Sequence, residues 1–266
     1  KMKSIYINIL LFCLSMFPIS MLANNDSLSL NNNHISAETI KMKADSAFAA
    51  EDFALAETLY LELANQGESA SIYYNLGCTY YRQDMMAKAV LWFERALLLD
   101  PSDSDIRFNL SMARGKTVDR IIPKHEMFFV SLWKSLMHNF SVSEWAYWAI
   151  TTFILSLLIV ALYLYSSTIV LRKVGFFGCI FCLLLCVLFN TLAYSLRNYN
   201  NTHTAGIIME PAVTVKSPPT KSGTELFVIH EGTRVEIKDN SMREWAEVQI
   251  ADGKIGWIEK NTFEAI

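Results

Sequence analysis

The sequence predicts a multidomain membrane protein that combines an all-α repeat domain, a two-helix transmembrane hairpin and a small all-β domain. Three patterns lead to this prediction. Residues 36–115 repeat with a period of 33–34, two later runs lack charged residues, and short segments after Thr204 follow a period of two. The first pattern is typical of stacked helix pairs, the second of membrane spans and the third of strands.

The composition excludes nucleic acid as a partner. The 266 residues carry a net charge of −3 and the isoelectric point is near 6.0, so there is no basic field for phosphates. The hydrophobic content of 52% exceeds the roughly 45–50% of soluble globular proteins. Apolar residues beyond those of an ordinary core are therefore present, as membrane spans require.

The N-terminus has the layout of a secretory signal peptide. Lys1 and Lys3 precede the apolar run Ile5–Phe17, and small residues then lead into a polar stretch. We predict a signal peptide over residues 1–23 and a polar linker over residues 24–35. Whether the peptide is cleaved stays open.

Two runs without charge, Trp145–Leu171 and Val174–Leu196, each exceed the roughly 20 residues that a helix needs to cross a membrane. We place the spans at residues 145–165 and 174–196. The loop between them, residues 166–173, holds two basic residues, which favours the cytoplasm. An exported N-terminus followed by two crossings then puts both soluble domains on the periplasmic side of the bacterial inner membrane.

The repeat domain is predicted over residues 36–120. Positions separated by 33 match in kind: Ala44/Gly77, Phe53/Met86, Ala56/Ala89, Tyr60/Phe93 and Leu63/Ala96. Small residues that recur where helices cross, with aromatic residues beside them, are what stacked helix pairs require. A third copy opens at Ser104 and stops after one helix, so we expect the helix 104–118 to cap the stack.

The stretch from Tyr73-Tyr-Asn-Leu-Gly77 to Asp100-Pro101 closely resembles the tetratricopeptide repeat. The resemblance implies a groove that is lined by the first helix of each pair, at Lys41, Tyr74, Asn75, Cys78, Tyr81, Arg82, Phe108 and Met112. This groove would hold a peptide segment of a partner, with Asn75 and Arg82 bonding its backbone or a carboxylate. Alternatively, Tyr74, Tyr81 and Phe108 complete the packing between helices.

A juxtamembrane segment, residues 121–144, separates the repeats from the first span. Large apolar residues recur in it at helical spacing, with charged residues between them: Phe128, Phe129, Leu132, Trp133, Leu136 and Met137. We expect an amphipathic helix at the bilayer surface. The alternative is that its apolar face packs on the repeat domain or on a partner.

A linker over residues 197–204 precedes a β domain over residues 205–266. Short β-branched strands are predicted around residues 212–215, 226–229, 235–237 and 245–250, and Asp252-Gly253 predicts a type I′ hairpin turn. The segment resembles the bacterial SH3-like domain, whose members commonly bind peptides or cell-wall material. Trp245 and Trp257 would offer a stacking surface, although a tryptophan in so small a barrel is more often a packing residue.

No catalytic, metal or cofactor site is predicted. The spacing of Cys179, Cys182 and Cys186 fits redox or metal motifs, but the run around them is apolar and has no histidine or charge to stabilise thiolates. Small apolar residues at a helix contact explain them better. The five histidines show no ligand spacing, so we expect a protein that is not an enzyme.

The order of these parts resembles the BatE-type proteins of the Bacteroides aerotolerance (Bat) group. The resemblance implies partner membrane proteins that carry von Willebrand factor A domains, and a role in aerotolerance or envelope stress. We therefore expect an envelope scaffold or adaptor that binds partners through its groove and its SH3-like domain. The alternative is a module that senses peptidoglycan or a peptide.

Overall fold

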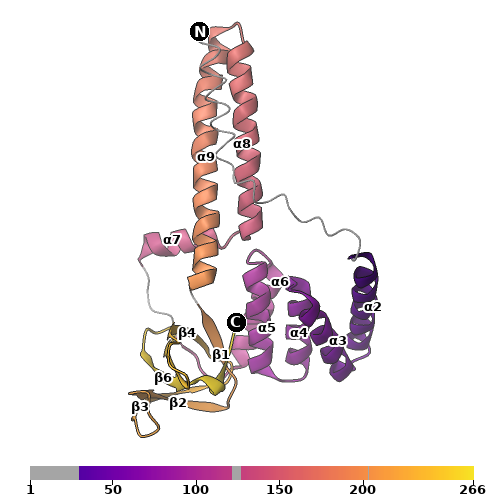
Figure 1. Ribbon diagram of the computed structural model, residues 1–266, viewed down its shortest axis with the longest axis vertical. Helices are drawn as coiled ribbons and strands as arrows, with labels where there is room; N and C mark the ends of the chain where they lie inside the picture. Colours follow the sequence, from indigo (N-terminus) through magenta and orange to yellow (C-terminus); the bar gives the residue numbers. More distant parts are fainter. Residues whose placement is uncertain (1–29, 122–126, 203) are drawn as a thin grey trace.

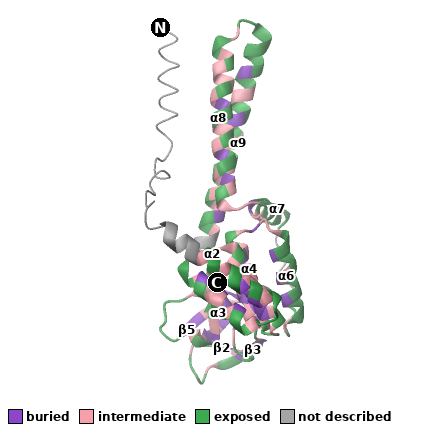
Figure 2. Ribbon diagram, turned by 90° about the vertical axis from the view of Figure 1, so that its right-hand side faces the viewer, coloured by how far each residue is buried: buried purple, intermediate pink, exposed green. Residues whose placement is uncertain are grey.

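The computed structural model describes residues 30–121, 127–202 and 204–266 (Figure 1). It confirms the predicted fold class: a helical repeat region, two long apolar helices and an antiparallel β domain. The predicted signal peptide, residues 1–23, and the first part of the polar linker lie outside the described residues. Buried residues gather inside the repeat region and the sheet, whereas exposed residues cover most of the long hairpin (Figure 2).

Five helices form the repeat region: α2 (Leu30–Ala49), α3 (Phe53–Gln66), α4 (Ala70–Arg82), α5 (Met86–Leu99) and α6 (Ser104–Lys116). Glu51, in the turn between α2 and α3, has a φ of 62°. Asp84, in the turn between α4 and α5, has the same φ and lies 33 residues later. Positive φ is uncommon outside glycine, so the recurrence of this conformation shows that the two pairs have the same turn. The sequence period is therefore a structural period.

The matched positions of the two copies form the helical core. Ala56, Tyr60 and Leu63 on α3 are buried, and so are their counterparts 33 residues later, Ala89, Phe93 and Ala96 on α5. A methyl group added at Gly77 of α4 would lie 2.5 Å from the Phe93 ring. Only glycine lets α4 approach α5 this closely, which explains why small and aromatic residues alternate in the repeat.

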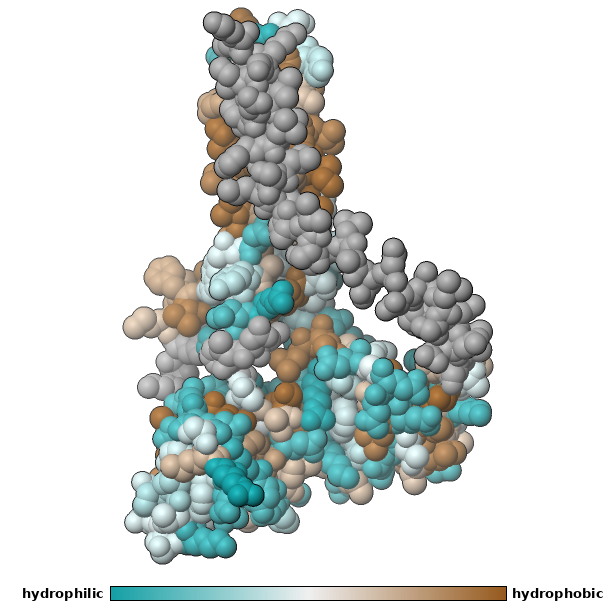
Figure 3. All heavy atoms as spheres, in the orientation of Figure 1, coloured by the Kyte–Doolittle hydropathy of each residue, from teal (hydrophilic) through white to brown (hydrophobic). Residues whose placement is uncertain are grey.

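Two long helices form a hairpin: α8 (Val142–Tyr165) and α9 (Ile169–Thr202). Both are long and apolar enough to cross a membrane and could anchor the chain there. Hydrophobic residues cover the visible sides of the hairpin (Figure 3). Ser141 and Glu144 form a complete capping box at the start of α8. The helices extend beyond the predicted spans, and α9 takes in both Arg172 and Lys173 and most of the expected linker 197–204.

A short helix, α7 (Phe128–Met137), lies beside the base of the hairpin and crosswise to it (Figure 1). Its large apolar side chains are exposed, except Met137, which is buried against Trp145, Leu192 and Leu196. The Trp145 indole donates to the Met137 carbonyl over 3.1 Å. Trp145 is thus a packing residue that fixes α7 to the hairpin.

Seven strands form the β domain: β1 (Ala205–Ile208), β2 (Ala212–Ser217), β3 (Thr224–His230), β4 (Arg234–Asp239), β5 (Trp245–Gln249), β6 (Ile255–Glu259) and β7 (Phe263–Ala265). The strand order is β3-β2-β6-β5-β4-β1-β7, and every pair is antiparallel. Strands β2 to β5 coincide with the four predicted ones, and β6 follows the predicted hairpin turn, whereas the sequence does not predict β1 and β7. Alternate residues such as Val213, Val215, Ala246 and Val248 face inward and form the core.

The predicted type I′ turn between β5 and β6 is wrong. Such a turn needs positive φ at both central residues, but here Gly253 has φ 95° while Asp252 does not have a positive φ. The Gly253 amide donates to the Ile250 carbonyl over 2.9 Å and closes the turn. One left-handed glycine therefore suffices, as in the longer hairpin loops that carry a bulge.

The β domain packs directly on the helices. Ile207 of β1 is fully buried and belongs to the core of the repeat region, together with Met209 and the C-terminal Ile266, which are partly buried there. Helix α5 contacts β1 at this point. Because the third repeat stops after α6, β1 covers the side of α5 that a sixth repeat helix would otherwise cover. Helix α6 is therefore not the only cap of the stack.

Candidate partner-binding face

The polar residues predicted to line the groove are bonded within the repeat region. Lys41 pairs with Asp45 over 2.8 Å on the same helix. The Arg82 guanidinium pairs with Glu51 over 3.0 Å and lies over the ring of Phe53, 5.2 Å from its centre. Both contacts join neighbouring turns or helices of the stack. Any partner carboxylate would have to compete with these internal acids for Lys41 and Arg82.

The predicted tyrosines join α4 to α6. Asn109 of α6 donates to the Tyr74 hydroxyl over 3.0 Å, and Lys116 of α6 lies 4.1 Å from the centre of the Tyr81 ring. Burial, together with the neighbouring Cys78, raises the pKa of Tyr74 to about 12. Burial also raises the pKa of the Cys78 thiol. Both groups are therefore neutral at physiological pH and hold no charge for a ligand or for catalysis.

An apolar strip remains exposed on α6. The Phe108 side chain is 63% exposed and Met112 is 46% exposed. Together with Lys116 they are spaced at i, i+4 and i+8, so they share one face of the helix. We call Phe108, Met112 and Lys116 the α6 strip. Exposure of this extent argues that Phe108 contributes little to packing, which favours the binding interpretation for this residue.

The predicted residues thus separate into two groups. Tyr74, Tyr81 and the half-buried Asn75 lie where α4 meets its neighbours, whereas the α6 strip is open. Lys116 is not among the residues predicted from the sequence to lie on this face. Its spacing from Phe108 and Met112 indicates that it belongs there, because every fourth residue of a helix returns to nearly the same face. Lys116 also lies 4.0 Å from Asp84, so it is only loosely paired.

A network of charges, which we call the junction, holds the β domain on the helices. Asp119, just beyond α6, accepts hydrogen bonds from the His230 amide and the Thr233 hydroxyl and bonds the His230 ring, each over 2.7 Å. Burial opposes ionisation of Asp119, but these hydrogen bonds outweigh it and lower the pKa of the carboxyl. The network therefore contains an ionised carboxylate at neutral pH.

Further charges complete the junction. Glu94 of α5, whose side chain is 8% exposed, pairs with Arg114 of α6 and lies 3.7 Å from Arg234 of β4. Arg95 pairs with Glu264 over 2.9 Å and donates to the carbonyl of Ala265. Glu94 and Arg114 are near each other in the sequence, but the other partners lie more than a hundred residues apart. No sequence pattern predicts contacts at that separation.

The tryptophans of the predicted SH3-like surface differ in exposure. Trp245 is only 9% exposed, whereas Trp257 is half buried. Both lie on the outer face of the β5–β6 pair, since Ala246 and Ile258 beside them face the core. A ligand could stack on Trp257, but Trp245 offers little of its ring.

The cysteines of the hairpin lie at or near the contact between its helices. Cys182 is buried, and the Cys186 thiol donates to the Ala149 carbonyl of α8 over 3.5 Å. Within the described ranges, no cluster of three or more histidine, cysteine or acidic residues could hold a metal ion.

A sequence profile described as the tetratricopeptide repeat matches residues 70–103. The match covers α4 and α5, the pair with the most complete motif. No significant match is found among curated proteins. The tetratricopeptide repeat is a non-catalytic fold for protein interactions, so the repeat region is similar to protein-binding scaffolds, and protein partners are implied.

Proposed function

We propose that this protein is a membrane-anchored envelope scaffold that holds an apolar segment of a partner protein on the α6 strip. The observation that supports the proposal is the exposure of Phe108 and Met112 one turn apart on the same face of the last repeat helix. Apolar anchors beside a cation are typical of surfaces that bind a short segment in groove or helix-face recognition. A partner with one or two large apolar side chains and an acidic residue for Lys116 fits best.

Membrane anchoring by α8 and α9 would keep this surface close to other membrane proteins. In our proposal both soluble parts lie in the periplasm. The resemblance to the Bat group suggests partners with von Willebrand factor A domains and a role in aerotolerance or envelope stress. Because the β domain packs on the repeat helices, the two soluble parts form one unit. A partner bound to the α6 strip would therefore be connected to the membrane through this unit and the hairpin.

Co-purification from native membranes tests the proposal. We compare the wild-type chain with a Phe108→Ser, Met112→Ser variant and with a control, Leu55→Ser, which changes an exposed leucine on α3. We expect envelope proteins to be recovered with the wild type and the control, and to be lost from the strip variant. Equal recovery with all three would contradict the proposal. Binding to isolated cell wall that is lost in Trp257→Ala would favour the wall-sensing alternative.

A further inference from the structure

Two cavities meet at helix α7. One of about 910 Å³ lies between the end of α6, α7 and the β domain, and a second of about 450 Å³ lies between α7 and the last turns of α9. Val130, Lys134 and Tyr199 line both. The two cavities are therefore adjacent, and we call them together the α7 cleft.

The end of the cleft nearest the hairpin is apolar and aromatic. Phe129, Trp133 and Met137 of α7 line the smaller cavity together with Tyr194 of α9. Hydrophobic residues are visible on the outer part of α7 and along both sides of the hairpin (Figure 3). Apolar and aromatic side chains at the end of a membrane span lie at the depth of the lipid headgroups and upper acyl chains. This end of the cleft suits a hydrocarbon chain.

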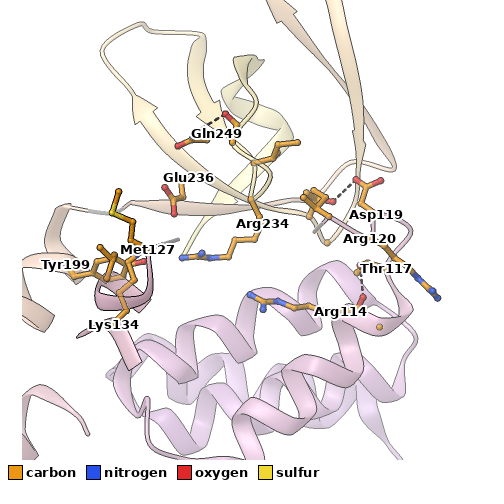
Figure 4. Close-up of a pocket in the computed structure, with 18 residues that line it drawn as sticks. Arg114, Thr117, Asp119, Arg120, Met127, Lys134, Tyr199, Arg234, Glu236 and Gln249 are labelled. Carbon is orange, nitrogen blue, oxygen red and sulfur yellow. Dashed lines mark hydrogen bonds between the residues drawn. The ribbon is translucent and has the colours of Figure 1, made fainter. Parts of the chain in front are cut away.

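The other end of the cleft is basic. Arg234 of β4 and Arg114 of α6 point into the larger cavity from opposite walls, with Lys134 on its far side (Figure 4). The two arginines share one carboxylate, Glu94. The Nε atom of Arg234 is buried and makes no hydrogen bond among the described residues, because its ion-pair partner Glu94 lies 3.7 Å away, beyond hydrogen-bond distance. An anion that reached this atom would supply the missing acceptor.

The acidic residues at this end are bonded to internal partners, and they are fewer than the basic residues that line the cavity. Asp119 is bonded by His230 and Thr233, and Glu236 pairs with Lys238 over 2.9 Å. Arg120 also lines the cavity but points away from the other basic side chains (Figure 4). The cleft therefore runs from an apolar end beside the hairpin to an end with a small excess of positive charge.

We propose that the α7 cleft binds an anionic phospholipid, with an acyl chain along the α7 and α9 aromatics and the headgroup phosphate beside Lys134, Arg114 and Arg234. The polarity of the cleft matches that of such an amphiphile, and its place at the base of the hairpin puts it where lipid is available. Bound lipid would also fix the soluble unit against the membrane. This inference rests on membrane anchoring but not on partner binding by the α6 strip.

Native mass spectrometry of the full-length protein tests the site. The protein is incorporated into nanodiscs of phosphatidylcholine with a minor share of phosphatidylglycerol, then released in mild detergent so that retained lipid can be identified. We expect selective retention of one phosphatidylglycerol. Lys134→Gln should lower retention about fivefold, and Lys134→Gln with Arg234→Gln about 25-fold, because each basic residue near anionic lipid contributes about 1 kcal/mol.

The matched control is Lys173→Gln, which removes a positive charge at the opposite end of the hairpin. It should leave retention unchanged. Equal retention of the two lipids, or equal loss in Lys134→Gln and Lys173→Gln, would overturn the proposal. Displacement of the lipid by millimolar inorganic phosphate would also overturn it, since the site would then take free phosphate. Incorporation into nanodiscs reports separately on anchoring, and capture of partners reports separately on the α6 strip.

Discussion

Replacing Asp119 by alanine should loosen the β domain from the repeat region while leaving both folded. Asp119 accepts hydrogen bonds from the His230 amide and the Thr233 hydroxyl, and its side chain is 16% exposed. It is the residue of the segment after α6 that bonds the β3–β4 turn. The cores on both sides of the junction do not depend on it.

The magnitude follows from the donors left without an acceptor. Removing one partner of a buried hydrogen bond costs about 1–3 kcal/mol, or about 5- to 150-fold in the population of the open junction. The His230 amide cannot turn toward water without disturbing β3, whereas the Thr233 hydroxyl can rotate. The free-energy cost therefore comes mainly from the His230 amide, and we expect a total of about 1–3 kcal/mol rather than twice that amount.

The effect should depend on pH. The pKa of Asp119 is lowered in the folded state, so the carboxylate contributes stability that is fully present above its unfolded pKa of about 3.9. This contribution is lost as the pH falls through the lowered pKa. The difference between wild type and Asp119→Ala should accordingly be constant near neutral pH and shrink below about pH 4.

Hydrogen exchange measured by mass spectrometry on the detergent-solubilised chain is the assay. Peptides that cover the β3–β4 turn should exchange about 5- to 150-fold faster in Asp119→Ala, while the core of α4 and α5 stays protected. The control is Glu231→Ala, which removes an exposed carboxylate from the same turn. Unchanged exchange at the turn in Asp119→Ala, or equal acceleration in the control, would refute the role assigned to this residue.

Four further substitutions test the packing. Gly77→Ala should destabilise the repeat region by about 1–3 kcal/mol, seen as a lower melting temperature, because the new methyl group meets Phe93. Ile207→Ala should cost about 2–5 kcal/mol through the cavity left in the helical core, and both soluble parts should become more sensitive to protease. Gly232→Ala should open the junction, since its φ is 80° and an added methyl would lie 2.5 Å from Thr117; unaltered exchange there would contradict this. Ser141→Ala should fray the start of α8 at a cost of about 1 kcal/mol, measurable by exchange at residues 142–145.

The parts of the fold that the sequence predicts are those with local patterns. The pairs Ala56/Ala89 and Tyr60/Phe93 recur every 33 residues and are buried together, because each repeat buries its apolar face against its neighbour. The two long helices follow from length and absence of charge alone. The strands from β2 to β5 carry alternating or consecutive apolar and β-branched residues, whereas β1 and β7 are too short to show a pattern.

The parts that the sequence does not predict depend on distant contacts. Asp119 and His230 meet across 111 residues, and neither carries a motif that marks the other. Trp145 stands at the start of a membrane span, but the sequence does not show that α7 packs beside it. In the structure its indole donates to the Met137 carbonyl of α7. Arg82 looks like a ligand-binding cation, but its acidic partner Glu51 is found only once the helices are packed. Lys41 differs, because its partner Asp45 lies one turn along the same helix.

Site-specific photo-crosslinking in intact cells tests the central claim most directly. A photoreactive amino acid is placed at Phe108 or Met112, and at the control positions Leu55 and Leu98, which are also exposed but lie on α3 and α5. We predict adducts with an envelope protein from positions 108 and 112, and none from the controls. Absence of adducts at both strip positions, or equal adducts at Leu55 and Leu98, would contradict a partner-binding role for the α6 strip.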